Sequence, residues 1–187
     1  VVMKKRQVYF EKKLYLAEML KESEKGYISG FFGKGCTPLG WFKDHGYDET
    51  DFIHKHPNGN GHGDWWEPAD KTLIPLDDPK RVFSLAKTSN AFLEKRAKDK
   101  KPFFLTISHY ALHVRNMSLK STRRKYLDMV AEREGIEGKI PDISKFDPNA
   151  DEMPPKMKSH WERANYAAMM ENMDTSIGMV LDKLKGL

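Results

Sequence analysis

Hydrophobic and polar positions fall into blocks that predict alternating helices and strands. Two short runs, residues 27–32 and 102–107, are almost continuously apolar and contain several aromatic and β-branched side chains. Such runs are typical of strands buried on both faces of a parallel sheet that has helices on each side. Pro102 fits only at the first position of its strand, where its missing N–H costs little. We therefore predict an α/β fold in which these two runs are parallel strands ending at one edge of the same sheet.

Apolar side chains at helical spacing mark the segments around these strands. Residues 10–25 predict an amphipathic helix that ends at Gly26. Asp78 and Pro79 are typical of a helix start, with aspartate as the N-cap and proline at the first helical position, and this helix should continue to about residue 98. Residues 118–134 predict a surface helix.

A final helix is expected from about Ser159, and it carries the clearest stripe in the sequence. Its apolar positions alternate between spacings of four and three residues: Tyr166, Met170, Met173, Ile177, Val180 and Leu184. This spacing places the side chains on one face of a helix. A stripe rich in methionine is typical of core packing, so we expect this face to be buried.

Two long connections complete the chain, residues 41–77 and residues 135–155. A connection as long as residues 41–77 is usually functional or mobile, and we interpret it as a loop on the substrate side. Trp65 and Trp66 offer flat apolar faces suited to sugar rings, and packing anchors are the alternative. Several potential metal ligands also lie in it: His54, His56, His62 and Asp64. The glycines around them provide no rigid scaffold, so we predict no metal site there.

Composition narrows the class of protein. With 187 residues, 39% hydrophobic and 32% charged, the chain should form one globular domain. No apolar run has the length of a membrane span, and the first residues lack the pattern of a signal peptide. The net charge of +5 comes from interspersed acidic and basic residues, which predict a solvated surface or a basic cleft for an anion. We find no nucleic-acid-binding motif and expect no nucleic-acid partner. The single cysteine, Cys36, excludes an internal disulfide.

Polar side chains with catalytic potential follow both predicted strands. Lys34 lies between two glycines after the first strand. The second strand is followed within a few residues by Ser108, His109, Tyr110, His113 and Arg115. Ligands of open α/β sheets bind beyond the carboxyl ends of the strands, which predicts a site here. The alternatives are a flexible surface turn at Lys34, a strand end with solvated histidines, and a solvated arginine at position 115.

Three motifs resemble the sulfatase family of the arylsulfatase type. Residues 101–113, Lys-Pro-Phe-Phe-Leu-x-x-Ser-His-Tyr-Ala-x-His, look like that family's central strand and active-site loop. The helix Leu-Ala-Glu-Met-Leu-Lys at residues 16–21 and the strand and Gly-Lys turn at residues 26–34 resemble the preceding elements. Residues 166–184 are similar to the helix after the histidine loop. The matches occur in the family's order and span most of residues 14–187.

The resemblance implies an alkaline-phosphatase-like α/β fold with a mostly parallel sheet flanked by helices, of which the chain would hold an incomplete part. Residues 1–187 would belong to a single sulfatase catalytic domain. Family members use a formylglycine nucleophile and a divalent cation, usually calcium. By position, Lys34 and His113 match the catalytic lysine and histidine. His109 and Arg115, with Trp65 and Trp66, are then expected on the substrate side.

The sequence also departs from the family pattern. Gly-Lys is usually followed by Trp-His, whereas Gly35 and Cys36 stand here. Cys36 begins Cys-Thr-Pro, which matches part of the Cys-x-Pro-x-Arg motif that is converted to formylglycine. Gly40 replaces the arginine, and the family cysteine precedes the Gly-Lys turn, so we predict that Cys36 is not the nucleophile. No residues of this chain match the family's metal ligands.

We therefore expect an internal part of a sulfuric ester hydrolase that acts on sulfate esters of sugars or aryl alcohols in the full-length protein. The chain alone is expected to be inactive. The alternative is a non-catalytic sulfatase-like protein that binds sulfated glycans. The family suggests a periplasmic or secreted location, and the sequence leaves the oligomeric state undetermined.

Overall fold

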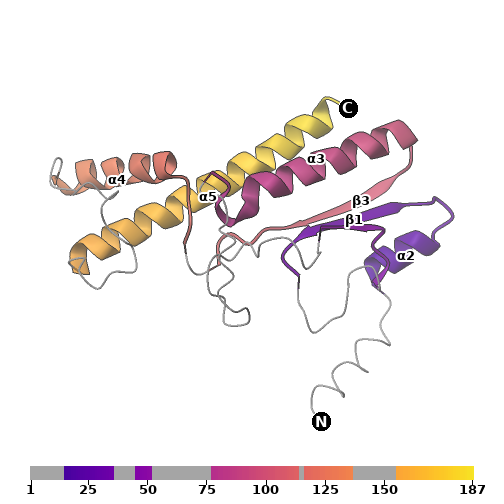
Figure 1. Cartoon of the computed structure of the whole chain (residues 1–187), viewed down its shortest axis with the longest axis horizontal. Coiled ribbons are helices and arrows are strands. Elements are labelled where there is room, and N and C mark those ends of the chain that lie inside the picture. Colours follow the sequence, from indigo (N-terminus) through magenta and orange to yellow (C-terminus); the bar gives the residue numbers. More distant parts are fainter. Residues whose placement is uncertain (1–14, 36–44, 52–76, 114–115, 137–154) are drawn as a thin grey trace, which may run out of the picture.

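The computed structural model describes residues 15–35, 45–51, 77–113, 116–136 and 155–187, without the side chains of residues 155–157. Its elements follow one another as a mixture of helices and strands (Figure 1). In chain order they are α2 (Leu16–Glu22), β1 (Ile28–Gly33), β2 (Glu49–Thr50), the 3-10 turn η3 (Pro79–Arg81), α3 (Val82–Asp99), β3 (Phe103–Ser108), α4 (Lys120–Glu134) and α5 (Pro155–Lys185).

The described strands form one parallel sheet in the order β2-β1-β3. Gly30 pairs with Leu105 in its centre, and Gly33 pairs with Ser108 at its carboxyl edge. This confirms that the two apolar runs are parallel strands that end together, each one residue later than predicted. β2 lies inside the segment expected to be a long connection, and its two residues are too few to give a sequence pattern.

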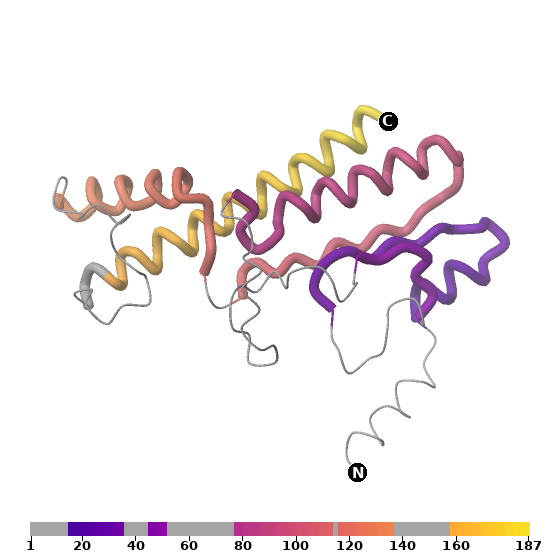
Figure 2. The backbone as a smooth tube through the Cα atoms, viewed as in Figure 1, coloured from indigo at the N-terminus to yellow at the C-terminus, as the bar shows by residue number. Residues whose placement is uncertain are grey.

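Helices cover both sides of the sheet, which confirms the predicted α/β class. α3 packs against β1 and β3, and α5 runs alongside α3. α2 contacts β1 from the opposite side, below the sheet in Figure 1. The smooth trace in Figure 2 shows α4 over the first half of α5, away from the strands. No helix in the described part of the chain is both long and apolar enough to cross a membrane.

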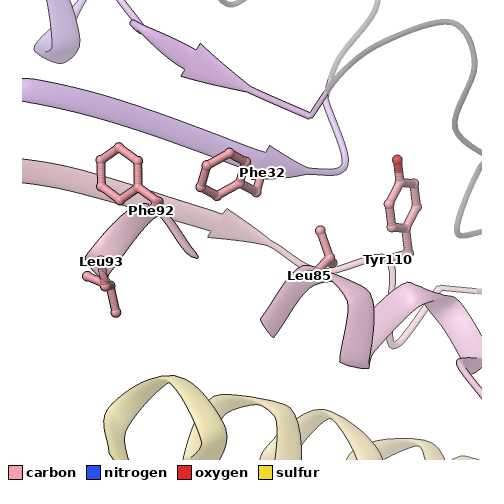
Figure 3. Packing of buried hydrophobic residues seen from close by; sticks show 5 residues of the cluster. All are labelled: Phe32, Leu85, Phe92, Leu93 and Tyr110. Atoms are coloured by element: carbon pink, nitrogen blue, oxygen red, sulfur yellow. The ribbon is translucent and has the colours of Figure 1, made fainter. Parts of the chain in front are cut away.

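The core lies between the sheet and α3. Phe32, Leu85, Phe92, Leu93 and Tyr110 form its buried cluster (Figure 3). Phe92 meets the ring of Phe32 edge-on at a centroid distance of 5.8 Å, and it meets Phe103 at 6.0 Å. A Cβ atom on Gly30 would lie 3.0 Å from the Phe92 ring, so the glycine lets α3 approach the centre of the sheet closely. This packing holds the N-terminal end of α3 near the carboxyl edge of the strands.

The expectation that both strands are buried on both faces is correct for β1 and wrong for β3. All β1 residues except Ile28 are buried, whereas every residue of β3 is only half-buried. The difference follows from position, because β1 lies between two strands and β3 lies at the edge of the described sheet.

Helix boundaries differ from the predicted ones by a few residues. α2 ends at Glu22, before Gly26, although Gly26 has the positive φ of 63° expected after a helix. Asp78 and Pro79 begin η3, and α3 follows it to Asp99. α4 agrees with the predicted surface helix, and α5 begins at Pro155, four residues earlier than expected.

The prediction that the apolar stripe of the last helix is buried is wrong. Tyr166, Met170, Ile177 and Leu184 are exposed, while Met173 and Val180 are half-buried. The buried face of α5 consists mainly of small and polar residues: Ala164, Asn165, Ala168, Asn172 and Ser176, together with Met169 and Trp161.

Hydrogen bonds explain this reversal. The Ser176 hydroxyl donates to the Val82 carbonyl oxygen at 2.6 Å, which ties α5 to the start of α3. The Asn172 side chain accepts from the Leu119 N–H at 2.9 Å, and Asn165 bonds the Asn116 carbonyl just before α4. Small residues allow close helix approach, and Asn165, Asn172 and Ser176 find partners there. This face therefore packs, while most of the stripe stays exposed.

Candidate functional site

The carboxyl edge of the sheet brings Lys34 next to the segment that holds the histidines. The Lys34 N–H donates to the Ser108 carbonyl oxygen at 2.7 Å, directly beyond the Gly33–Ser108 pair of the sheet. Gly33 has φ of 104°, a conformation that residues with a Cβ rarely adopt. A Cβ atom there would overlap the Ser108 carbonyl oxygen and lie 2.9 Å from its carbon. Glycine is therefore required for β1 to turn toward β3 and deliver Lys34.

Asp51 holds the same turn from the other side. It directly follows β2, and its Oδ1 accepts a hydrogen bond from the Gly33 N–H at 2.8 Å. Its Oδ2 accepts from Arg81 Nη2 at 3.0 Å, and both side chains are more than nine-tenths buried. A buried carboxylate is stable only when it is paired and hydrogen-bonded, and Asp51 meets both conditions. The ends of β1 and β2 are thus joined through one buried ion pair.

The Arg81 side chain comes from an unusual backbone conformation. Lys80 and Arg81 both have positive φ, 55° and 57°, although neither is glycine. The Arg81 N–H donates to the Asp78 carbonyl at 3.0 Å, and Asp78 Oδ1 accepts from the Phe83 and Ser84 N–H groups at the start of α3. The Arg81 guanidinium also lies 6.0 Å from the Tyr110 ring centroid. Arg81 therefore connects the start of α3 with the loop after β3.

His109 lies on that loop and is half-buried. Its Nδ1 atom is buried and has no hydrogen-bond partner among the described residues. Burial lowers the pKa of His109 below its ordinary value because the charged imidazolium loses hydration. The neutral ring is favoured at neutral pH, which suits a supporting or hydrogen-bonding role better than a fixed positive charge.

His113 is exposed, and Lys34 is half-buried. The His113 N–H donates to the Tyr110 carbonyl at 3.0 Å and closes a turn four residues after His109. Both side chains thus follow strands that end at one edge, as the sequence predicts. Within the part of the chain that is described, no hydrogen bond or ion pair joins them, so their convergence on one anion stays a prediction.

Several predicted positions lie outside the described residues: Cys36, Trp65, Trp66 and Arg115. Conversely, Asp51 and Arg81 were missed by the sequence reasoning. Asp51 lies in the segment expected to be a loop, and Arg81 follows a helix-start signal in which a charged side chain is normally solvated. An aspartate and an arginine thirty residues apart form no sequence motif that would predict their pairing.

The described residues at this edge do not fit a calcium site. The described ranges contain no group of three or more histidine, cysteine, aspartate or glutamate side chains that could hold an ion. Asp51, the buried carboxylate next to Lys34, already bonds Arg81 and Gly33 with its two oxygens. Because Arg81 already neutralises its charge, Asp51 is a poor ligand for a further cation.

Comparisons with known proteins bear on the chemistry of this edge. A family model described as Sulfatase matches residues 9–187, which includes every described element. A comparison with curated proteins found no relative of significant sequence similarity.

Proposed function

Because this chain belongs to the sulfatase family, we propose that it contributes the Lys34 and His113 side of an active site that hydrolyses sulfate esters. The observation that carries the proposal is the pairing of β1 and β3, which ends at Gly33 and Ser108. Lys34 therefore lies beside the histidine loop, the segment after β3 that holds His109 and His113. A substrate anion bound beyond this edge would meet side chains from both strand ends. Sugar sulfates and aryl sulfates are the proposed substrates.

Sulfate ester hydrolysis needs positive charge near the sulfate oxygens and a proton for the leaving alcohol. The Lys34 ammonium group supplies a positive charge that stabilises the sulfate as the ester bond breaks. His113 donates a proton to the leaving oxygen, or alternatively binds a sulfate oxygen. Its exposure leaves it accessible to a substrate from solvent.

The remaining predicted residues take supporting roles in this proposal. His109, neutral and half-buried, supports the loop and contacts substrate through its ring. Arg115 adds positive charge near the sulfate, and Trp65 and Trp66 stack on a sugar ring. Formylglycine and calcium supply the nucleophile and the sulfate-binding cation in the family, and none of the described residues is assigned to either.

Two alanine substitutions in the complete protein test this proposal. Lys34→Ala should lower kcat on the order of 100-fold or more with a smaller change in KM, because its charge acts mainly in the transition state. His113→Ala should slow substrates with poor alkoxide leaving groups more than activated aryl sulfates, because only the former need a proton. Lys101→Ala is the control, since Lys101 is exposed at the opposite end of β3.

Equal losses on both substrate types would assign His113 to sulfate binding and remove its role as the acid. Normal kcat in Lys34→Ala would contradict the proposed site altogether.

A second candidate function is binding of sulfated glycans without hydrolysis. It is favoured by Gly35 and Cys36, which replace the Trp-His pair that usually follows the family lysine. In that case the complete protein would bind a sulfated oligosaccharide by calorimetry and release no sulfate, and Lys34→Ala would abolish the binding. Sulfate release by the wild-type protein would exclude this alternative.

A further inference from the structure

The backbone that leads into Lys34 is held by two hydrogen bonds on consecutive N–H groups. The Gly33 N–H donates to Asp51 Oδ1, and the Lys34 N–H donates to the Ser108 carbonyl. These bonds fix the peptide planes on both sides of Gly33. The direction in which the chain leaves β1, and hence the position of the Lys34 Cα atom, depends on both of them.

The bond to Asp51 is assisted by charge. Asp51 pairs with Arg81 at 3.0 Å, and the exposed fractions of the two side chains are 6% and 9%. A hydrogen bond to an ionised acceptor is shorter and stronger than one between neutral groups. Arg81 supplies the opposite charge to this carboxylate inside the protein, where an unpaired charge would be strongly unfavourable.

The ion pair contacts the ends of β1 and β2 and the loop after β3. Asp51 follows β2, Gly33 ends β1, and the Arg81 guanidinium lies over the ring of Tyr110, the second residue after β3. The left-handed backbone at Lys80 and Arg81 is unfavourable for residues with a Cβ. Strained conformations of this kind persist only where the surroundings fix them, and they cluster at functional sites.

We propose that Asp51 and Arg81 form a clamp that positions Lys34 for the sulfate ester, and that neither residue touches the substrate. This inference rests on the function proposed above for Lys34. It assigns to the Asp51–Arg81 clamp the task of holding the Gly33–Lys34 turn against the end of β3. Loss of the Asp51 bond to Gly33 should therefore act on catalysis mainly through Lys34.

A double-mutant cycle in the complete protein tests this, with 4-nitrophenyl sulfate as the probe. Asp51→Asn keeps the shape of the side chain and removes its charge. It should lower kcat about 10- to 100-fold with little change in KM, as expected for a displaced catalytic group. In a Lys34→Ala background the same substitution should have almost no further effect on kcat. A merely structural role would not give this dependence on Lys34.

Arg96→Gln is the matched control. Arg96 is equally buried, pairs with Glu49 at 3.3 Å and Asp99 at 3.0 Å, and lies over the Phe92 ring at 5.3 Å. It is fifteen residues from Arg81, about 22 Å along a helix. Its loss should lower Tm comparably and leave kcat unchanged.

Equal kcat losses from Asp51→Asn with and without Lys34 would overturn the clamp, as would a comparable loss in Arg96→Gln. If Asp51→Asn does not fold, Arg81→Lys replaces it in the same cycle, because lysine keeps the charge but loses the planar fork of donors.

A measurement without substrate separates this inference from the proposed function. Amide hydrogen exchange, followed by NMR, reports how firmly the Gly33 N–H is held. Asp51→Asn should speed exchange at Gly33 at least tenfold relative to amides of α5, and unchanged exchange would overturn the clamp. If exchange rises as expected and the wild-type protein neither hydrolyses the ester nor binds sulfate, the clamp holds the turn but the proposed sulfatase role of Lys34 is wrong.

Discussion

Substitution of Gly33 by alanine is the most direct test of the geometry at the sheet edge. At φ of 104° a Cβ atom would overlap the Ser108 carbonyl oxygen. Left-handed backbone costs an L-residue about 1–2 kcal/mol. To relieve the overlap, Lys34 must move away from Ser108, and the hydrogen bond between them, worth about 0.5–1.5 kcal/mol, is lost. The same movement weakens the charge-assisted bond from Gly33 to Asp51, worth about 1.5–3 kcal/mol. Gly33→Ala should therefore destabilise the protein by about 3–6.5 kcal/mol.

Urea unfolding monitored by circular dichroism measures this change. Gly26 and Gly135 are matched controls, because they have φ of 63° and 62° and a Cβ atom at either position would have nothing within 4 Å. Alanine at either control position should cost only about 1–2 kcal/mol. If Gly33→Ala is no more destabilising than the controls, the close approach of β1 to Ser108 does not contribute to stability.

Two further predictions concern His109 and α5. Burial lowers the pKa of His109, so below about pH 6.5 the unfolded chain takes up a proton that the folded chain does not. The free energy of unfolding should therefore fall as pH drops from about 6.5 toward the folded pKa. His109→Gln should reduce this dependence of stability on pH. A slope unchanged in the variant would show that other groups cause it. Ser176→Ala should lower the free energy of unfolding by about 0.5–1.5 kcal/mol, because the bond to Val82 is lost. Ile177→Ser, on the exposed stripe, should stay within about 0.5 kcal/mol of wild type. Thermal unfolding measures both variants. A larger cost at Ile177 than at Ser176 would contradict the observed orientation of α5.

Local patterns were sufficient to predict the strands and the edge at which they end. The runs at residues 27–32 and 102–107 are apolar enough to identify β1 and β3, and their shared direction follows from the helix between them. That the Lys34 backbone lies next to the end of β3 could therefore be predicted as well, whereas the convergence of Lys34 and His113 stays a prediction. The sulfatase resemblance adds the roles of the side chains, which spacing alone does not define.

Features that depend on long-range partners could not be predicted. Asp51 and Arg81 are thirty residues apart, and neither sequence environment distinguishes a buried ion pair from two solvated charges. β2 is recognised only through its pairing with β1. The orientation of α5 was predicted wrongly because the prediction used only the periodicity of its apolar residues. The opposite face carries asparagines and a serine that hydrogen-bond to residue 82 and to the segment 116–122, and these bonds determine which face is buried.

The polar interface of α5 also determines how precisely this helix is placed. An apolar stripe tolerates sliding, because one hydrophobic contact can replace another at little cost. The side-chain groups of Asn165, Asn172 and Ser176 each have a specific partner on the neighbouring segments. A shift of one helical turn, about 5.4 Å, would break these bonds together and leave buried donors and acceptors unpaired. The register of α5 is thus set by a few amides and a hydroxyl, and its outward apolar stripe is held in one fixed orientation.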